Sequence, residues 1–239
     1  MIPTALLLLA DSRLPAGGHA HSGGLEPAVT SGSVHDVLSL AAFLQGRLAT
    51  TGLVTAALTA AACTHAHATW TPPATSADPT PPSQASWARL DAEADARTPS
   101  PAQRAASRAQ GRSLLRAART TWPGSGSLDA LAEAVATPHQ AVVLGAAAAA
   151  AHATPHQAAT VVVYQAVTGP ASAAVRLLGL DPLAVHRLLA ELAPEVDATA
   201  VRAAEAAAGG WARLPALSAP LLDLHAELHV RADLRLFES

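Results

Sequence analysis

The sequence predicts an all-α fold, a single-domain helical bundle of about nine to eleven helices over residues 1–239, with low β content. Half of the residues are hydrophobic but only 3% are aromatic, so Ala, Leu and Val must fill the core. Ala and Leu are strong helix formers, and the Ala-rich blocks at 56–62 and 146–151 favour closely packed helices. No segment alternates apolar and polar residues between turn signals at strand spacing.

Local signals place the helix ends in the first part of the chain. A glycine-rich loop precedes a helix that is expected to begin near Ser22 and to end at residues 31–32. Ser33 is predicted to be the N-cap of the next helix, with Asp36 near the positive end of its dipole. The Thr-Thr-Gly sequence at 50–52 is expected to kink or break that helix.

Proline and glycine set the later boundaries. Pro138 is expected in the first turn of one helix, and Pro155 opens another, which the Gly-Pro pair at 169–170 interrupts. Gly179 and Asp181 mark a stop and a restart. The helices expected beyond residue 32 cover residues 33–48, 53–67, 84–96, 101–121, 128–136, 138–152, 155–178 with the interruption at 169–170, 183–192, 196–208 and 217–228.

Prolines crowd the segment 70–87, between two predicted helical regions. Proline lacks the backbone N–H that a helix interior needs, so a regular helix is excluded over this stretch. The composition is typical of an exposed insert, and we expect residues 70–87 to form a mobile loop.

Composition excludes several chemistries. The chain has no Lys, so a Walker A loop or a Schiff-base lysine is impossible, and Cys63 alone excludes an internal disulfide. The net charge of −3 gives no basic footprint for nucleic acid. The N-terminus lacks a basic region before its short apolar run, and the apolar block at 142–151 is too short to span a membrane. We expect a cytoplasmic protein.

Histidines offer the strongest case for metal chemistry. The chain contains 11 of them, and imidazole suits Zn, Cu and Ni. His19 and His21 are one residue apart on the glycine-rich loop, and His225 and His229 have the i,i+4 spacing of one helix face. The Glu does not directly follow His225, so the H-E-x-x-H pattern is not met. These four are weak metal-ligand candidates, and packing histidines are the competing interpretation.

Charged residues form two patterns. The carboxylates of Asp91, Glu93 and Asp95 are interpreted as a solvated face. No acid occurs between Arg97 and Arg119, and arginines recur between them at every fourth position, which on a helix gives one basic stripe. A solvated face and a surface for an acidic partner are both open readings of this stripe. The arginines are Arg104, Arg108, Arg112 and Arg116.

The last residues, 229–239, end on an apolar Leu-Phe pair between charges. Chain termini are usually poorly ordered unless a contact ties them down. A partner could order this tail, with Phe237 as an aromatic anchor and Arg235 making a charged hydrogen bond.

Five stretches of the chain agree in order with the motifs of one family. They are LPAGGHAHSGGLE at 14–26, an Arg-rich helix at 104–115 that contains GRSLL, HQAVVLG at 139–145, ASAAVRL at 171–177 and the ending HVRADLRLFES at 229–239. Together they resemble the urease accessory protein family UreF over nearly the whole chain. Departures from the family pattern fall at His19, His21, Asp181, Val230 and Asp233.

The resemblance implies an all-α homodimer with no catalytic site. Such a protein is a chaperone and scaffold in the complex that inserts nickel into apo-urease, and it binds UreD (also called UreH) and the GTPase UreG. Nickel would be handled by the complex and not bound as a cofactor of this chain. By position, the tail residues would order against UreD, and the loop residues would face UreG or line the route of nickel. The implied partner-binding residues are His19, His21, Glu26, Arg176, His229, Arg235, Leu236 and Phe237.

Two other functions remain open from the sequence. A histidine-based metal-binding protein or metalloenzyme would use His19 with His21, or His225 with His229. A helical regulator that binds a small molecule is the third hypothesis, although no helix-turn-helix or ligand motif supports it.

Overall fold

The computed structural model describes residues 3–11, 14, 21–69, 84–232 and 236–237. These residues contain eleven α-helices and no β-strand element, which confirms the all-α class. The helices are α1 (Thr4–Ala10), α2 (Leu25–Thr30), α3 (Val37–Arg47), α4 (Leu53–Thr69), α5 (Gln84–Ala96), α6 (Pro101–Thr121), α7 (Gly126–Ala134), α8 (Gln140–Ala150), α9 (Pro155–Leu178), α10 (Pro182–Ala208) and α11 (Pro220–His229).

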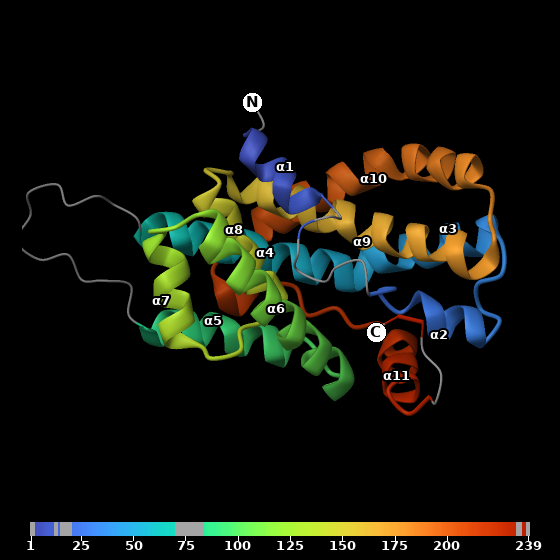
Figure 1. Cartoon of the computed structure of the whole chain (residues 1–239), viewed down its shortest axis with the longest axis horizontal. Helices are drawn as coiled ribbons and strands as arrows, with labels where there is room; N and C mark the ends of the chain where they lie inside the picture. The colour runs from blue at the N-terminus through green and yellow to red at the C-terminus, as the bar shows by residue number, and fades with distance from the viewer. Residues whose placement is uncertain (1–2, 12–13, 15–20, 70–83, 233–235, 238–239) are drawn as a thin grey trace, which may run out of the picture.

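Helix α4 runs through the centre of the bundle and packs against α8, α9 and α10 (Figure 1). Small residues allow the close approach of α8. A Cβ added at Gly145 would lie 2.3 Å from the Thr59 carbonyl oxygen and 2.5 Å from the Ala62 Cβ. Since no side chain fits between them, the two helix backbones are in direct contact, as the Ala-rich composition predicted.

Several predicted boundaries agree with the structure. Helix α6 covers Pro101–Thr121, and the Ser100 hydroxyl accepts a hydrogen bond from the Gln103 N–H at its start. Gly179 ends α9 in the left-handed conformation, with φ of 64°, and Asp181 caps α10.

The N-cap of α3 is Asp36, so the prediction of Ser33 was wrong. The Asp36 carboxylate accepts a hydrogen bond from the Ser39 N–H at 2.7 Å, and the Ser39 hydroxyl accepts one from the Asp36 N–H in return. This reciprocal pair favours the later start. The predicted interruption at 50–52 is a π-helical turn, Leu48–Gly52, that widens the helix between α3 and α4 without breaking it.

Helix α9 continues through Pro170, where the sequence predicted an interruption. Proline cannot donate to the carbonyl four residues earlier. In this structure the Arg47 Nε–H donates to that carbonyl, on Ala166, at 3.2 Å. Helix α10 likewise continues through Pro194, which is exposed, so water can bond the freed carbonyl.

Other boundaries move by a few residues. Helix α8 begins at Gln140 with His139 as its N-cap, so Pro138 lies outside the helix. Helix α5 begins at Gln84, and Trp87 is fully buried, so the expected loop at 70–87 is shorter at its carboxyl end. Residues 70–83 lie outside the described residues.

Two helical stretches, Val37–Ala68 and Pro155–Leu178, are long and apolar enough to cross a membrane. Length and composition are weak evidence of a span, because the core helices of a bundle pass the same test. Both stretches belong to the central packing of α3, α4 and α9.

Candidate partner-binding site at the carboxyl terminus

Helix α11 lies beside α2 and the start of α6 (Figure 1). One oxygen of the Glu227 carboxylate accepts hydrogen bonds from the Ser100 hydroxyl at 2.5 Å and from the Ala102 N–H at 2.8 Å. These hydrogen bonds lower the pKa of Glu227. On its other side, Leu222 reaches Gly24, where an added Cβ would lie 3.3 Å from it. Helix α11 is therefore held by both neighbours.

The outer side of α11 is apolar. Leu221, Leu224 and Leu228 are 57%, 55% and 54% exposed. Their spacing of three and four residues places them on one side of the helix. We call these three residues the leucine face. An apolar stripe of this kind normally packs on a protein surface, so its exposure marks a candidate interface.

Next to α11, the chain terminus is docked on three side chains that we call the tail socket: Glu26, Arg176 and His229. Glu26 is 8% exposed, and its carboxylate accepts hydrogen bonds from the N–H groups of Leu236 and Phe237, at 2.8 and 2.9 Å. The Phe237 side chain is buried beneath the Arg176 guanidinium, which lies 4.3 Å from the ring centroid.

His229 completes the socket. Its Nε2 lies 3.0 Å from the Phe237 carbonyl oxygen, and since a carbonyl only accepts, this nitrogen carries the proton. The same Nε2 is 3.6 Å from the Glu26 carboxylate. The backbone of Leu236 is thus fixed while its side chain is 80% exposed. The socket buries one apolar tail residue and presents the other to solvent.

The partner-binding residues predicted from the sequence fall into three groups: those in the tail socket, one beside it, and those outside the described residues. Glu26, Arg176, His229 and Phe237, which are far apart in the chain, meet in the tail socket. His21 lines a hollow together with Gly24 and Leu222 at the base of α11. His19 and Arg235 lie outside the described residues, as does Asp233.

Sequence reasoning missed two residues that position this site. Glu227 fixes α11, and Arg47 donates to the carbonyls of Gly23 and Ala166 and so links the approach to α2 with α9. Burial lowers the pKa of Arg47 to about 10. The one usable signal for Arg47 was Pro170, whose helix needs an outside donor.

In the histidine pair on α11, the Nε2 of His229 is used for the Phe237 carbonyl, and burial lowers the pKa of His225. A metal site at this pair stays a prediction. Among the described residues, a different set has the spacing of metal ligands: Asp91, Asp95 and His139, whose ligand atoms lie within 4.8 Å of one another.

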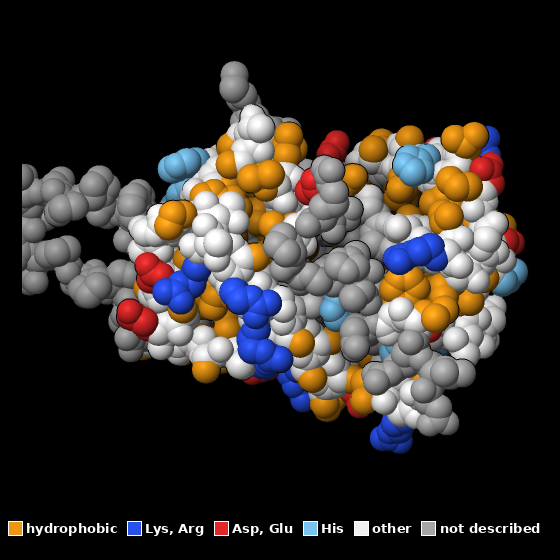
Figure 2. Space-filling model, in the orientation of Figure 1, with side chains coloured by type: hydrophobic (Ala, Val, Ile, Leu, Met, Phe, Trp, Pro, Cys, Tyr) orange, Lys and Arg blue, Asp and Glu red, His pale blue; other side chains and the backbone are white. Residues whose placement is uncertain are grey.

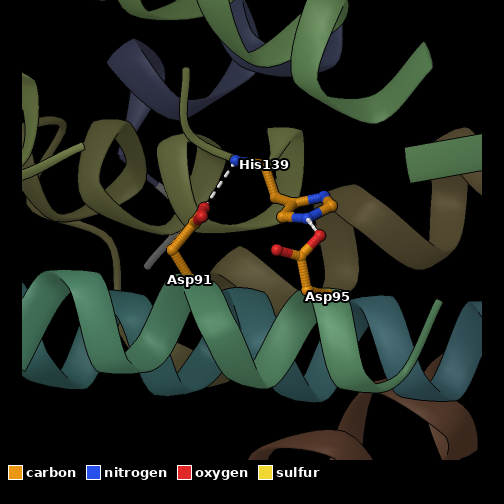
Figure 3. Close-up of side chains that lie close together, drawn as sticks. All are labelled: Asp91, Asp95 and His139. Atoms are coloured by element: carbon orange, nitrogen blue, oxygen red, sulfur yellow. Dashed lines mark hydrogen bonds and ion pairs between the residues drawn. The ribbon is translucent and has the colours of Figure 1, made fainter. Parts of the chain in front are cut away.

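Figure 3 shows this set, with Asp91 and Asp95 one turn apart on α5 and His139 facing them from the start of α8. Asp91 accepts a hydrogen bond from the His139 N–H at 2.7 Å, and Asp95 lies 2.9 Å from its Nε2. The His139 Nδ1 is 3.0 Å from the Ser107 hydroxyl. Arg108 donates to both carboxylates, at 3.0 and 2.5 Å.

These contacts do not fit a metal ion. Both ring nitrogens of His139 are engaged, and the positive Arg108 donates to both carboxylates, so a cation bound there would be repelled by it. Burial raises the pKa of Asp95, but hydrogen bonds from His139 and Arg108 outweigh it and lower the pKa overall. The set is a structural link between α5, α6 and α8.

This link overturns one prediction. Asp91 and Asp95 were interpreted as part of a solvated face, but Asp91 is 4% exposed and both residues pair with Arg108. Glu93 pairs with Arg97 on the same helix. The sequence could not show this, because Arg108 follows Asp91 by 17 residues and meets it only when α5 and α6 pack.

Fold and site together define an all-α protein that presents an apolar helix face beside its docked carboxyl terminus. Comparison with known families makes the assignment specific. The sequence model of the UreF family matches residues 34–193. The chain therefore belongs to the UreF family of urease accessory proteins.

Full-length relatives agree. The chain is 47% identical to the urease accessory protein UreF of Mycolicibacterium vanbaalenii over 234 residues, which cover 98% of this chain and 97% of the relative. It is 48% identical to the UreF of Mycobacterium sp. (strain JLS), over 99% and 98% of the two chains. For the UreF of Mycobacterium tuberculosis H37Rv the identity is 43%, over 94% and 92%. The family assigns a role in urease maturation, and the name of accessory protein points to a role without catalysis.

Proposed function

We propose that this protein is a non-catalytic, homodimeric scaffold of the cytoplasm that bridges UreD and the GTPase UreG while nickel is inserted into apo-urease. Nickel is the cargo of the whole complex in this proposal, and the chain holds no metal of its own. The observation that carries the proposal is the carboxyl-terminal site. There, an exposed apolar helix face lies beside a tail whose backbone is fixed and whose Leu236 side chain is exposed.

The leucine face and Leu236 are assigned to UreD. Apolar side chains presented on rigid elements lose little conformational freedom on binding, so they give affinity at low entropic cost. Helix α11 is rigid because Glu227 holds it to α6, and Leu236 is held through its backbone by Glu26. UreG is assigned to a surface other than the leucine face and Leu236, so that UreD and UreG can bind at the same time.

The assignment is tested by co-purification with UreD. The double variant Leu224→Gln/Leu228→Gln removes apolar surface that contacts solvent in the free protein, so folding is preserved while binding to UreD is lost. Leu183→Gln is the matched control, because Leu183 is 79% exposed on the first turn of α10, far from α11 in the chain. Retention of UreD by the double variant at the wild-type level contradicts the assignment.

A second arm tests the tail, by one point variant and by a deletion that also removes His229 of the socket. Arg235→Ala and a chain lacking residues 229–239 are both expected to lose UreD without unfolding, which a thermal melt by circular dichroism verifies. Binding of UreG by the wild-type chain in the same assays tests the bridging role, and its absence contradicts that part of the proposal.

A further inference from the structure

The basic stripe of α6 separates into two groups in the structure. The first group is used inside the protein. Arg104 donates to the carbonyls of Thr98 and Pro99 at 2.6 and 2.8 Å, and Arg108 pairs with the two aspartates of α5. These arginines serve the fold and are not available to a partner.

The second group is Arg112, Arg116 and Arg119, which we call the α6 arginine face. All three are exposed, and basic side chains gather over α6 in the space-filling view (Figure 2). Arg119 pairs with Asp129 of α7 at 2.8 Å, in a contact that is about half exposed on both sides. The guanidinium groups of Arg112 and Arg116 make no hydrogen bond or ion pair with any residue that the structure describes.

The three guanidinium groups border a hollow of about 420 Å³ between α6 and α7. Leu115, Ala132 and Ala136 form the apolar part of its lining, and no acidic residue lines it. A hollow with an apolar lining and a rim of arginines suits a side chain that carries both methylene groups and a carboxylate.

Like charges one turn apart on a helix repel each other. The chain has no acid between Arg97 and Arg119 that could relieve this repulsion within α6. An external carboxylate relieves it and gains a charged hydrogen bond as well.

We propose that the α6 arginine face binds an acidic helix of a protein partner, through two carboxylates placed one turn apart. Arg112 and Arg116 are about 6 Å apart along the helix axis, from a rise of 1.5 Å per residue, and Glu or Asp residues at i,i+4 on a partner helix match this spacing. This surface lies on α6 and α7, apart from the tail socket and the leucine face, so it is a second docking surface.

Charge and lining favour an acidic protein over nucleic acid. The chain carries a net charge of −3, so a phosphate backbone is repelled by most of the molecule. The lining of the hollow contains no aromatic side chain on which a base could stack. A short acidic helix is small enough to contact only the α6 arginine face, so it experiences the positive charge there and little of the negative charge elsewhere.

A direct probe tests the proposal on the full chain. The probe is an alanine-based helical peptide with two Glu residues at i,i+4, compared with its Gln counterpart by NMR titration of the arginine Nε–H signals at low ionic strength. The wild-type chain is expected to bind the Glu peptide about tenfold more tightly than the Gln peptide, and salt should reduce the difference. The signals of Arg112 and Arg116 should shift.

The charge-reversal variant Arg112→Glu/Arg116→Glu should lose this preference and keep its thermal melting temperature. The control Arg187→Glu/Arg202→Glu makes the same change of net charge on α10 and should bind as the wild type does. Equal binding of the two peptides, an unaltered preference in the α6 variant, or tighter α6-dependent binding of a DNA duplex would each overturn the proposal.

A second arm uses UreD, UreG and apo-urease, each measured separately against the two variants. At least one of them is expected to bind the α6 variant about tenfold more weakly than the control. If every protein that binds the wild-type chain binds the α6 variant equally well, the proposal is contradicted. If the wild-type chain binds none of them, the proposed function fails, and the peptide titration alone decides on the α6 arginine face.

Discussion

Replacing Glu26 with Gln should release the tail from its socket while the helical bundle stays folded. The Glu26 carboxylate accepts two backbone N–H groups, from Leu236 and Phe237, in a nearly buried position. A glutamine offers one acceptor oxygen in place of two, and its NH₂ group faces a donor. One hydrogen bond to a charged group is lost and the other is weakened.

The magnitude follows from these two contacts. A hydrogen bond to a charged group contributes about 1.5–3 kcal/mol net. The tail can undock and be hydrated, so the loss appears as a shift of the docking equilibrium and not as a buried unpaired amide. The ratio of docked to undocked tail should fall by about 10- to 100-fold.

Carboxypeptidase digestion measures this ratio. When undocking and redocking are fast relative to cleavage, the rate of Phe237 release follows the undocked population. Release should be about 10- to 100-fold faster in Glu26→Gln, in line with the equilibrium shift. It should be unchanged in Glu205→Gln, the same replacement at an exposed position of α10. Equal rates in the wild type and Glu26→Gln would refute the socket. A large loss of melting temperature would instead indicate general unfolding.

Three further outcomes are expected. Gly111→Ala should lower the free energy of unfolding by about 1–3 kcal/mol, because the new Cβ would lie 1.9 Å from the Pro138 carbonyl oxygen. Gly126→Ala, where nothing lies within 4 Å, is the control in the same urea titration, and equal stabilities would contradict the close packing. Burial raises the pKa of the Cys63 thiol to about 12, so a thiol reagent at pH 8 should label this residue only after unfolding, and rapid labelling of the native protein would contradict its position. The lowered pKa of Asp95 stabilises the fold above the unfolded-state pKa of about 3.9, and this stability is lost as the pH falls through the folded-state pKa. The unfolding free energy of wild type should therefore decline more steeply on acidification below about pH 5 than that of Asp95→Asn, and identical pH profiles would contradict the link.

Helix class and many helix ends were predictable from the sequence because their causes are local. Ser100 precedes a helix with Pro in its first turn, Gly179 provides the left-handed residue that ends α9, and Asp181 can cap α10 by itself. Each signal acts within one turn of the backbone. The interruption predicted at Pro170 was wrong because the cause is not local. The Ala166 carbonyl that Pro170 leaves without a helical donor accepts a hydrogen bond from Arg47 on another helix.

The carboxyl-terminal site shows the same difference between what local sequence predicts and what packing decides. The family motifs identified Glu26, Arg176, His229 and Phe237 as residues of interest, but no pattern showed that they form one socket. Glu26 and Phe237 are 211 residues apart, and only the packing of α2 and α11 brings them together. The division of the α6 arginines into two groups also needed the structure. Their spacing in the sequence is uniform, but only Arg104 and Arg108 have partners inside the bundle.

The sequence alone determined a helical bundle, many of its helix ends and its family. Tertiary packing decided which charges are used inside the protein, that two prolines stay within helices, and that the carboxyl terminus docks on its own chain. The reason is physical: propensities and caps depend on neighbours in sequence, whereas pairing of buried charges and donors depends on which helix faces meet.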